Sequence, residues 1–411
     1  MTKLARPPLR TPPGPFRPGF WRSPLRGPWL TSALGSVLLV LVGIVALTGF
    51  ASHAAYMPDL PGNAIVPAGR DLPLVFDWPT SPSWLYALNQ GLHTNVGLVA
   101  IPFLLAKLWS VIPKLFAWPP VTGPWHAIER LSIALLVSSA VFEFATGVVN
   151  AQYWYPFKFN FVVAHYYGAI VFVASLALHV IVKWPVIRRA YRERGVLKPL
   201  RERLEDTRPE DGGEAAPATI SRRGLFAFAG AGALTLLAAN VGQSIGGPLR
   251  SLAFLAPRRE DFPINKRAAI AGVTPEMVGP SYRLVLRSGD AVTTLSREDL
   301  LALPQHTARL PIACVEGWST TQEWTGVRLS ELAERAGARG AGEVRVESLQ
   351  PKGVLRQASL SGDQIAAEDS MLALKVNGED LSLDHGYPAR IIVPALPGVH
   401  NTKWVGEMTF S

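Results

Sequence analysis

The sequence predicts a multi-domain chain: an all-α transmembrane bundle of four helices plus a fifth tether helix, followed by an α+β soluble domain. The composition is 48% hydrophobic and only 17% charged over 411 residues, which is unusual for a soluble protein. Five apolar stretches approach the roughly 20 residues that a bilayer requires. From about Pro248, short apolar runs alternate with Gly and Pro turns, as in a strand-rich soluble domain.

The five candidate spans cover residues 30–50, about 92–112, about 127–149, about 161–184, and 224–245. Basic residues collect before the first span and again at 183–208, and the formal net charge is +9. Because cytoplasmic loops carry the excess of Lys and Arg, the leader is placed inside, and alternation then places the second cluster inside as well. Both clusters flank apolar runs, so the basic charge indicates topology and not nucleic-acid binding.

These patterns divide the chain into five segments. Residues 1–29 are expected to be a disordered basic cytoplasmic leader, and residues 30–198 a transmembrane domain. Residues 199–219 form an expected cytoplasmic linker, 220–247 a transmembrane tether, and 248–411 an extracytoplasmic domain. The chain is therefore expected to be a multi-pass protein of the cell membrane, in contact with lipid.

Four of the eight histidines lie in or beside the second to fourth spans. His165 and His179 are 14 residues apart, which in a helix is about 21 Å of rise and nearly four turns. This spacing suits two stacked haems, with His93 as the outer partner of His165 and His126 as the inner partner of His179. His53 is a less favoured substitute for His93. The alternative is that these histidines form interfacial or helix–helix hydrogen bonds.

Two segments resemble the prokaryotic membrane cytochromes b. They are HAIERLSIALLVSSAVFEFATG (126–147) and AHYYGAIVFVASLALHVIV (164–182). The resemblance implies two b haems and electron exchange with quinol or quinone. Glu143 is either a proton relay for a quinol or a structural carboxylate, and the sequence does not separate these readings.

The fifth span begins with a pair of arginines. SRRGLFAFAGAGALTLLAA (221–239) resembles a twin-arginine export signal in an internal position. The alternative is that Arg222 and Arg223 only anchor a helix by their positive charge. Export of a folded domain suits a domain that receives a cofactor in the cytoplasm.

Cys314, in LPIACVEGWST (310–320), is the only cysteine of the chain. A lone thiol forms no intramolecular disulfide. Considered by itself, it is most often a small buried apolar residue. A nucleophile would need a base such as His306, whereas a thiolate is also a good ligand for a soft or high-valent metal.

Three segments of the soluble domain resemble the sulfite-oxidase-fold molybdopterin enzymes, most closely the catalytic subunits of protein-methionine-sulfoxide reductases. They are CVEGWS (314–319), EWTGVRLSELAE (323–334) and VNGEDLSLDHGYPARIIVPALPGVHNTKWVGEM (376–408). The resemblance implies that Cys314 binds molybdenum. It also implies pterin contacts at His385, Arg390 and Lys403, and a weaker one at Asn265.

The sequence departs from sulfite oxidases at Gly317-Trp318-Ser319, where that family has an Arg-containing segment. This favours a neutral oxide over sulfite. The expected function is electron transfer from quinol through b haems to an extracytoplasmic molybdopterin site that reduces a small-molecule or protein-bound S- or N-oxide, for example methionine sulfoxide. The alternatives are a sulfite or other donor dehydrogenase that passes electrons into the haems, and a membrane haem protein or sensor without molybdopterin.

Overall fold

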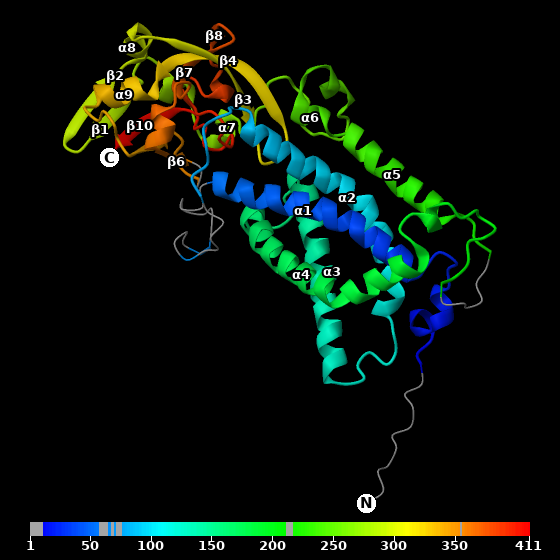
Figure 1. Cartoon of the computed structure of the whole chain (residues 1–411). Coiled ribbons are helices and arrows are strands. Elements are labelled where there is room, and N and C mark those ends of the chain that lie inside the picture. The colour runs from blue at the N-terminus through cyan, green and yellow to red at the C-terminus, as the bar shows by residue number, and fades with distance from the viewer. Residues whose placement is uncertain (1–10, 57–64, 67–69, 71–75, 211–216, 354–355) are drawn as a thin grey trace, which may run out of the picture. The chain divides into compact units, whose positions relative to one another are not determined.

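The computed structural model describes residues 11–56, 65–66, 70, 76–210, 217–353 and 356–411 (Figure 1). Parts of the predicted leader (1–10) and linker (211–216) lie outside these residues. The chain packs into two compact units, each discontinuous in sequence. The first comprises Met1–Ala46, Val96–Val148 and Ala164–Leu237, and the second comprises Leu47–Asn95, Val149–Val163 and Ala238–Ser411.

Five helices are long and apolar enough to cross a membrane, as the sequence predicted. They are α1 (Pro28–Ala55), α2 (Leu85–Leu115), α3 (Pro124–Ala151), α4 (Phe161–Arg194), and α5 (Arg222–Ala238) with the short α6 (Gly242–Ile245). The helices extend past the predicted apolar stretches, α4 as far as Arg194. Hydropathy marks the bilayer thickness, whereas the helix continues through Arg and Lys because these are good helix formers.

Apolar and polar contacts join the helices of the first unit. Val42 of α1, Ala140 of α3 and Phe172 of α4 form one buried cluster. The hydroxyl groups of Ser36 and Tyr191 lie 2.9 Å apart and tie α1 to α4. The first unit is therefore a packed helical bundle.

The arginine pair at the start of α5 is divided between buried and exposed positions. Arg222 has a fully buried side chain, and its guanidinium donates to Glu202 Oε2 at 2.7 Å and to the Arg208 carbonyl at 2.7 Å. Arg223 is exposed. A buried guanidinium requires such partners. These contacts give the anchoring alternative a specific structural basis, while the export signal stays a prediction.

Part of the expected leader is also packed. Residues Gly14–Phe16 and Pro18–Trp21 form two 3₁₀ helices. Leu25 and Trp29 are buried, and the Trp29 indole donates to the Gly195 carbonyl at 2.8 Å. The prediction of disorder rested on the Pro- and Arg-rich composition of the segment. An average composition does not reveal two individual apolar residues that pack.

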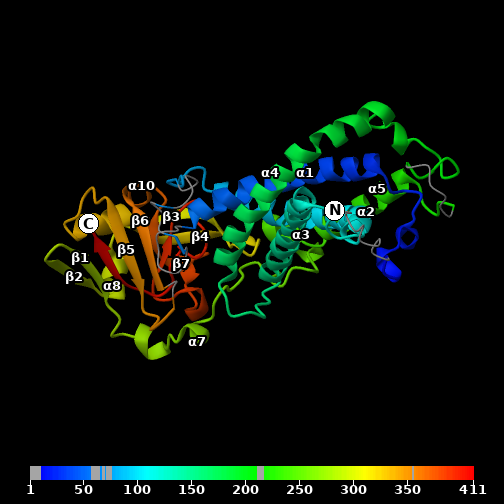
Figure 2. The same cartoon turned by 90° about the horizontal axis from the view of Figure 1, so that it is seen from below.

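The second unit contains two five-stranded sheets (Figure 2). One has the order β2-β1-β10-β5-β6, and the other has the order β3-β4-β7-β8 with β9 paired to β7. The strands are β1 (Leu284–Ser288), β2 (Ala291–Leu295), β3 (His306–Ala313), β4 (Ser319–Arg328), β5 (Glu343–Ser348), β6 (Gln357–Ser361), β7 (Met371–Val376), β8 (Glu379–Asp380), β9 (Arg390–Ile392) and β10 (Val405–Phe410). Short helices α7 (Ala268–Ala271), α8 (Arg297–Ala302), α9 (Leu329–Arg335) and α10 (Gly362–Ala366) complete an α/β domain consistent with the sulfite-oxidase-like prediction.

The core of this domain includes residues from the end of α1, the start of α2 and the connection between them. Ala55, Trp78 and Tyr86 belong to the same buried cluster as Val393 and Leu396. The Trp78 indole donates to the Ala395 carbonyl at 2.7 Å. The compact unit therefore begins well before the soluble part of the sequence.

Candidate cofactor and active site

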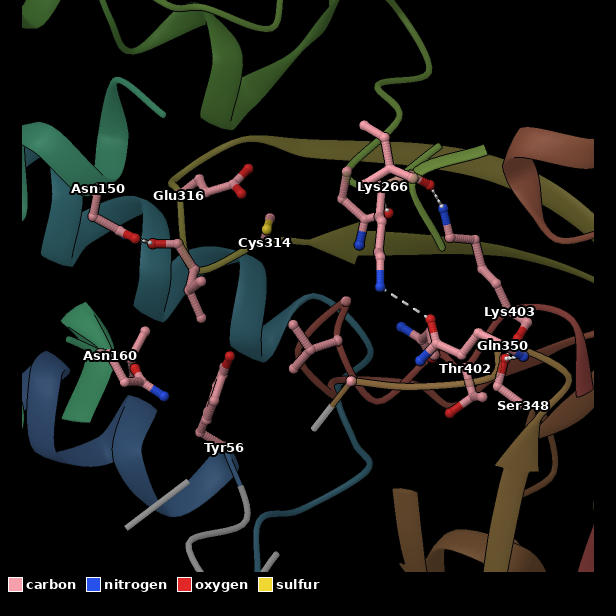
Figure 3. Close-up of a pocket in the computed structure, with 18 of the residues that line it drawn as sticks. Tyr56, Asn150, Asn160, Lys266, Cys314, Glu316, Ser348, Gln350, Thr402 and Lys403 are labelled. Atoms are coloured by element: carbon pink, nitrogen blue, oxygen red, sulfur yellow. Dashed lines mark hydrogen bonds between the residues drawn. The ribbon is translucent and has the colours of Figure 1, made fainter. Parts of the chain in front are cut away.

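A cavity of about 510 Å³ lies within the second unit. Its labelled residues form two groups (Figure 3). One group is basic or polar, and the other surrounds the single cysteine. The first contains Lys266, Ser348, Gln350, Thr402 and Lys403, and the second contains Tyr56, Asn150, Asn160, Cys314 and Glu316.

Cys314 lies in the turn that joins β3 to β4. Its amide donates to the Trp318 carbonyl at 2.9 Å, and the Gly317 amide donates to the Cys314 carbonyl at 3.0 Å. Gly317 has φ +97°, a conformation that favours glycine. The turn therefore presents the thiol to the cavity while its backbone is hydrogen-bonded.

The Cys314 thiol is buried, with 3% exposure. Burial, and then the neighbouring Glu316 carboxyl, raise the pKa of the thiol. A bound metal cation reverses this preference, because the ligand of a metal is the thiolate. His306 is at the opposite end of β3, eight residues from Cys314, which is about 26 Å at about 3.3 Å per residue. A Cys314–His306 nucleophile pair therefore has no geometric support.

The basic end of the site contains two buried cations. Arg390 is 4% exposed, and its Nη1 donates to the His385 carbonyl at 3.1 Å. Lys403 is 8% exposed, and its Nζ donates to the Asp384 carbonyl at 2.9 Å and to the Lys266 carbonyl. Burial lowers the pKa of Arg390 to about 9 and the pKa of Lys403 to about 6.

These cations fit an anionic cofactor. Within the described part of the chain, neither Arg390 nor Lys403 makes an ion pair, and Arg390 Nε and Asn401 Nδ2 are buried without a hydrogen-bond partner. Buried charges and donors are costly unless an acceptor satisfies them. A phosphate offers several acceptor oxygens, and guanidinium and ammonium groups are its usual partners. The residues present therefore suit the pterin phosphate that the sequence resemblance implies.

His385 is held firmly beside this group. Its ring stacks on Phe262 with centroids 3.7 Å apart, and its Nδ1 lies 2.8 Å from Ser382 Oγ. Burial lowers the pKa of His385, which favours the neutral ring. A Cβ built on Gly386 would lie 3.1 Å from Lys403 Cγ and 3.2 Å from Arg390 Cβ, so the turn brings both cations close to His385.

The structure brings together three of the predicted site residues in the cavity: Cys314, Asn265 and Lys403. Asn265 Oδ1 accepts from the Lys266 amide at 2.9 Å. His385 and Arg390 are not among the lining residues, and Gly386, next to His385, lies against both Arg390 and Lys403. The five assignments remain predictions.

Sequence reasoning missed the cavity residues that precede the soluble domain. Tyr56, Asn150 and Asn160 line the cavity beside Cys314. Tyrosines and asparagines at the ends of apolar helices also occur as ordinary interfacial residues. No local signal in the sequence distinguished the two roles.

Hydrogen bonds hold two of the predicted haem ligands in the first unit. His165 Nδ1 lies 2.8 Å from Thr146 Oγ1 and 3.1 Å from Glu143 Oε2. His126 Nδ1 accepts from the Thr122 amide at 3.1 Å. A metal-binding imidazole donates its other ring N–H to an acceptor. His165 can donate in this way to Glu143, whereas His126 Nδ1 accepts a hydrogen bond, so only the His165 contacts suit axial ligation.

His93 belongs to the second unit, where its ring packs closely on Gly49. A Cβ built on Gly49 would lie 2.8 Å from His93 Cε1, so only glycine admits the ring in this position. His179 is half-buried in α4. The described residues contain no group of three or more His, Cys, Asp or Glu side chains that could hold a metal ion. The haem pairing stays a prediction.

Comparison with known proteins matches residues 271–411 to the oxidoreductase molybdopterin-binding domain. The uncharacterized oxidoreductase YuiH of Bacillus subtilis is 36% identical over 28% of this chain and 58% of its own length. Mitochondrial sulfite oxidase of Mus musculus is 30% identical over 33% of this chain and 30% of its own length. A chain of the sulfane dehydrogenase SoxCD from Paracoccus pantotrophus is 28% identical over 32% of this chain and 38% of that chain, with a TM-score of 0.29.

Residues 271–411 are thus a molybdopterin-binding oxidoreductase domain of the sulfite oxidase type. The chain spans less than two thirds of the length of these curated relatives.

Proposed function

We propose that the chain is a membrane-bound molybdenum oxidoreductase that passes electrons from quinol through b haems to an extracytoplasmic molybdopterin site. There it reduces an S- or N-oxide, for example free or protein-bound methionine sulfoxide. Quinol releases two electrons and two protons, and the oxide takes up two electrons and two protons to give the reduced compound and water. When bound, the molybdenum–pterin group supplies oxygen-atom transfer and two-electron chemistry.

The observation that carries this proposal is a cavity with Cys314 in one group of lining residues and Lys266 and Lys403 in the other (Figure 3). Cys314 would bind the metal, and Arg390 and Lys403 would hold the cofactor phosphate, with His385 beside the pterin. The residues that this chain supplies bind, orient and shield the cofactor.

The proposed direction rests on the residues that follow Cys314. Trp318 donates its indole N–H to Glu316 Oε2 at 2.7 Å, and Arg258 Nε lies 3.6 Å from the same oxygen. Arg258 thus has a carboxyl partner. Residues 315–319, which follow the cysteine, contain no arginine that could bind sulfite, and this favours a neutral oxide.

The electron supply is proposed to come from the helical part. His165 with His93, and His126 with His179, would provide the axial ligands of two haems. The anchoring of His165 by Thr146 and Glu143 supports this role. Membrane lipid surrounds the five apolar helices in this proposal, with the N-terminus in the cytoplasm.

Metal and pterin analysis of the purified protein, with its reduced haem spectrum, tests the proposal. We expect molybdenum, pterin and haem iron together. Methionine sulfoxide should reoxidise haem that dithionite has reduced. Haem iron without molybdenum in fully matured protein would favour the sensor alternative.

The similarity to sulfite oxidases supports a second candidate, in which a donor such as sulfite is oxidised and electrons enter the haems. Sulfite should then reduce the oxidised haems, and methionine sulfoxide should leave reduced haems unchanged. The same spectrophotometric experiment separates the two directions.

A further inference from the structure

One wall of the cavity beside Cys314 comes from segments outside the matched domain. Tyr56 follows α1, Asn150 lies in the last turn of α3, and Tyr155 lies in the connection between α3 and α4. All three line the cavity and belong to the same compact unit as Cys314. Figure 3 shows Tyr56 and Asn150 in the group of residues around Cys314, apart from Lys403.

Hydrogen bonds tie this wall to the turn that carries the thiol. The Tyr155 hydroxyl donates to Asn150 Oδ1 at 3.1 Å, and Asn150 Nδ2 donates to the Val315 carbonyl at 3.3 Å. Gln90 Nε2 of α2 donates to the same carbonyl at 2.8 Å. Because Val315 directly follows Cys314, the wall and the thiol form one connected structure.

The wall is polar but uncharged. The cavity-lining cations Lys266 and Lys403 belong to the other group of residues in Figure 3. Near Cys314, Arg258 is engaged by Glu316 and stacks over the Tyr153 ring, with its Cζ 3.8 Å from the ring centroid. An oxyanion that enters here loses hydration without gaining a cation, which is costly. A neutral oxide needs only a hydrogen-bond donor for its oxygen and apolar surface for its substituents.

We propose that Tyr56, Asn150 and Tyr155 form the substrate-contacting wall of the site, and that this wall selects neutral S- or N-oxides over oxyanions. The Tyr56 hydroxyl and the second N–H of the Asn150 amide donate to the oxide oxygen. The Tyr155 hydroxyl orients that amide, and the tyrosine rings contact the substituents of the oxide. This inference rests on the proposed function. The residues that select the substrate would then lie at the ends of the apolar helices and in the connections between them.

Calorimetric titration of the purified full-length protein tests the wall without turnover. Dimethyl sulfone is the neutral probe and sulfate is its anionic counterpart. We expect wild-type protein to bind the sulfone more tightly than sulfate. The double variant Tyr56→Phe/Tyr155→Phe should bind the sulfone about tenfold more weakly, since it loses the Tyr56 hydroxyl and the Tyr155 hydrogen bond that orients the Asn150 amide.

Lys158→Ala is the matched control, because Lys158 lies in the same connection with an exposed side chain outside the cavity lining. The control and the double variant should both retain wild-type molybdenum content. With methionine sulfoxide, the double variant should raise KM more than it lowers kcat.

Equal sulfone affinity in the double variant and the Lys158→Ala control would overturn the wall, as would tighter binding of sulfate than of sulfone by wild-type protein. Absence of molybdenum from wild-type protein would instead overturn the proposed function. The sulfone titration still tests the wall in that case.

Discussion

At the scale of single residues, Cys314 is the side chain on which the proposed chemistry depends. Cys314→Ser replaces the thiol with a hydroxyl of similar size that is a poor ligand for a soft metal. We expect turnover of methionine sulfoxide to be abolished while the reduced haem spectrum stays unchanged. Turnover at the wild-type level would refute the ligand assignment.

Lys403 should make the free energy of unfolding of the cofactor-free protein depend on pH. Its pKa is lowered from 10.5 to about 6 in the folded chain, so between these values the unfolded chain binds a proton that the folded chain does not. The cofactor-free protein should therefore become more stable as the pH rises from about 6 toward 10.5, and less stable as it falls back. Thermal melting in detergent across this range checks the sign.

Substitution of Lys403 separates stability from cofactor binding. Lys403→Met removes the cost of deprotonating this amine on folding, and should stabilise the cofactor-free protein at pH 7 by on the order of a few kcal/mol. The same variant should retain less pterin. Lys352→Met, at an exposed position, is the control that should change neither quantity. Full pterin retention in Lys403→Met would contradict the phosphate-binding role.

At the scale of elements, the pairing of β4 with β7 depends on one glycine. A Cβ built on Gly326 would lie 2.0 Å from the Leu372 carbonyl oxygen, at the point where the register of the two strands shifts. Gly326→Ala should therefore lower the free energy of unfolding of the domain by about 3 kcal/mol. Because β4 begins directly after the Cys314 turn, molybdenum content should fall as well.

Gly342→Ala is the matched control for this substitution, since a Cβ built on Gly342 would have the Ser411 carbonyl oxygen as its nearest atom, at 3.9 Å. Denaturant unfolding of both variants provides the comparison. Equal midpoints would show that the β4–β7 pairing tolerates a side chain at position 326.

At the scale of the whole molecule, the proposed haem arrangement predicts two separable cofactors. His165→Ala and His179→Ala should each remove about half of the haem, because each ring serves a different haem. Pyridine haemochrome analysis gives the stoichiometry, and His306→Ala is the control. Complete haem loss in only one of the two variants would contradict the pairing.

The proposed topology is tested at the same scale. Alkaline phosphatase fused after Ser411 should be active, whereas a fusion after Glu205 should be inactive, because the basic cluster at 183–208 is expected to stay inside. Activity of the Glu205 fusion would reverse the orientation.

The sequence predicted those features whose signal is local. The apolar helices were found because a bilayer imposes a minimum length on them. The Cys314 turn and the Arg390–Lys403 segment were found because their residues follow a recognisable order. The wall residues Tyr56 and Asn150 were not found, because their role depends on contacts between segments more than 150 residues apart in the chain. The pairing of the haem-ligand histidines is equally difficult to predict from the sequence, because it also depends on contacts between distant segments.

The discontinuity of the second unit has a consequence for the order of assembly. Ala55, Trp78 and Tyr86 are synthesised long before Val393 and Leu396, with which they share a core. Part of the apolar surface of these early segments therefore stays exposed until the last strands have formed. In the proposed orientation this final closure takes place outside the cell membrane, after the domain has crossed. In that case the complete fold would form only in molecules whose C-terminal domain has been translocated.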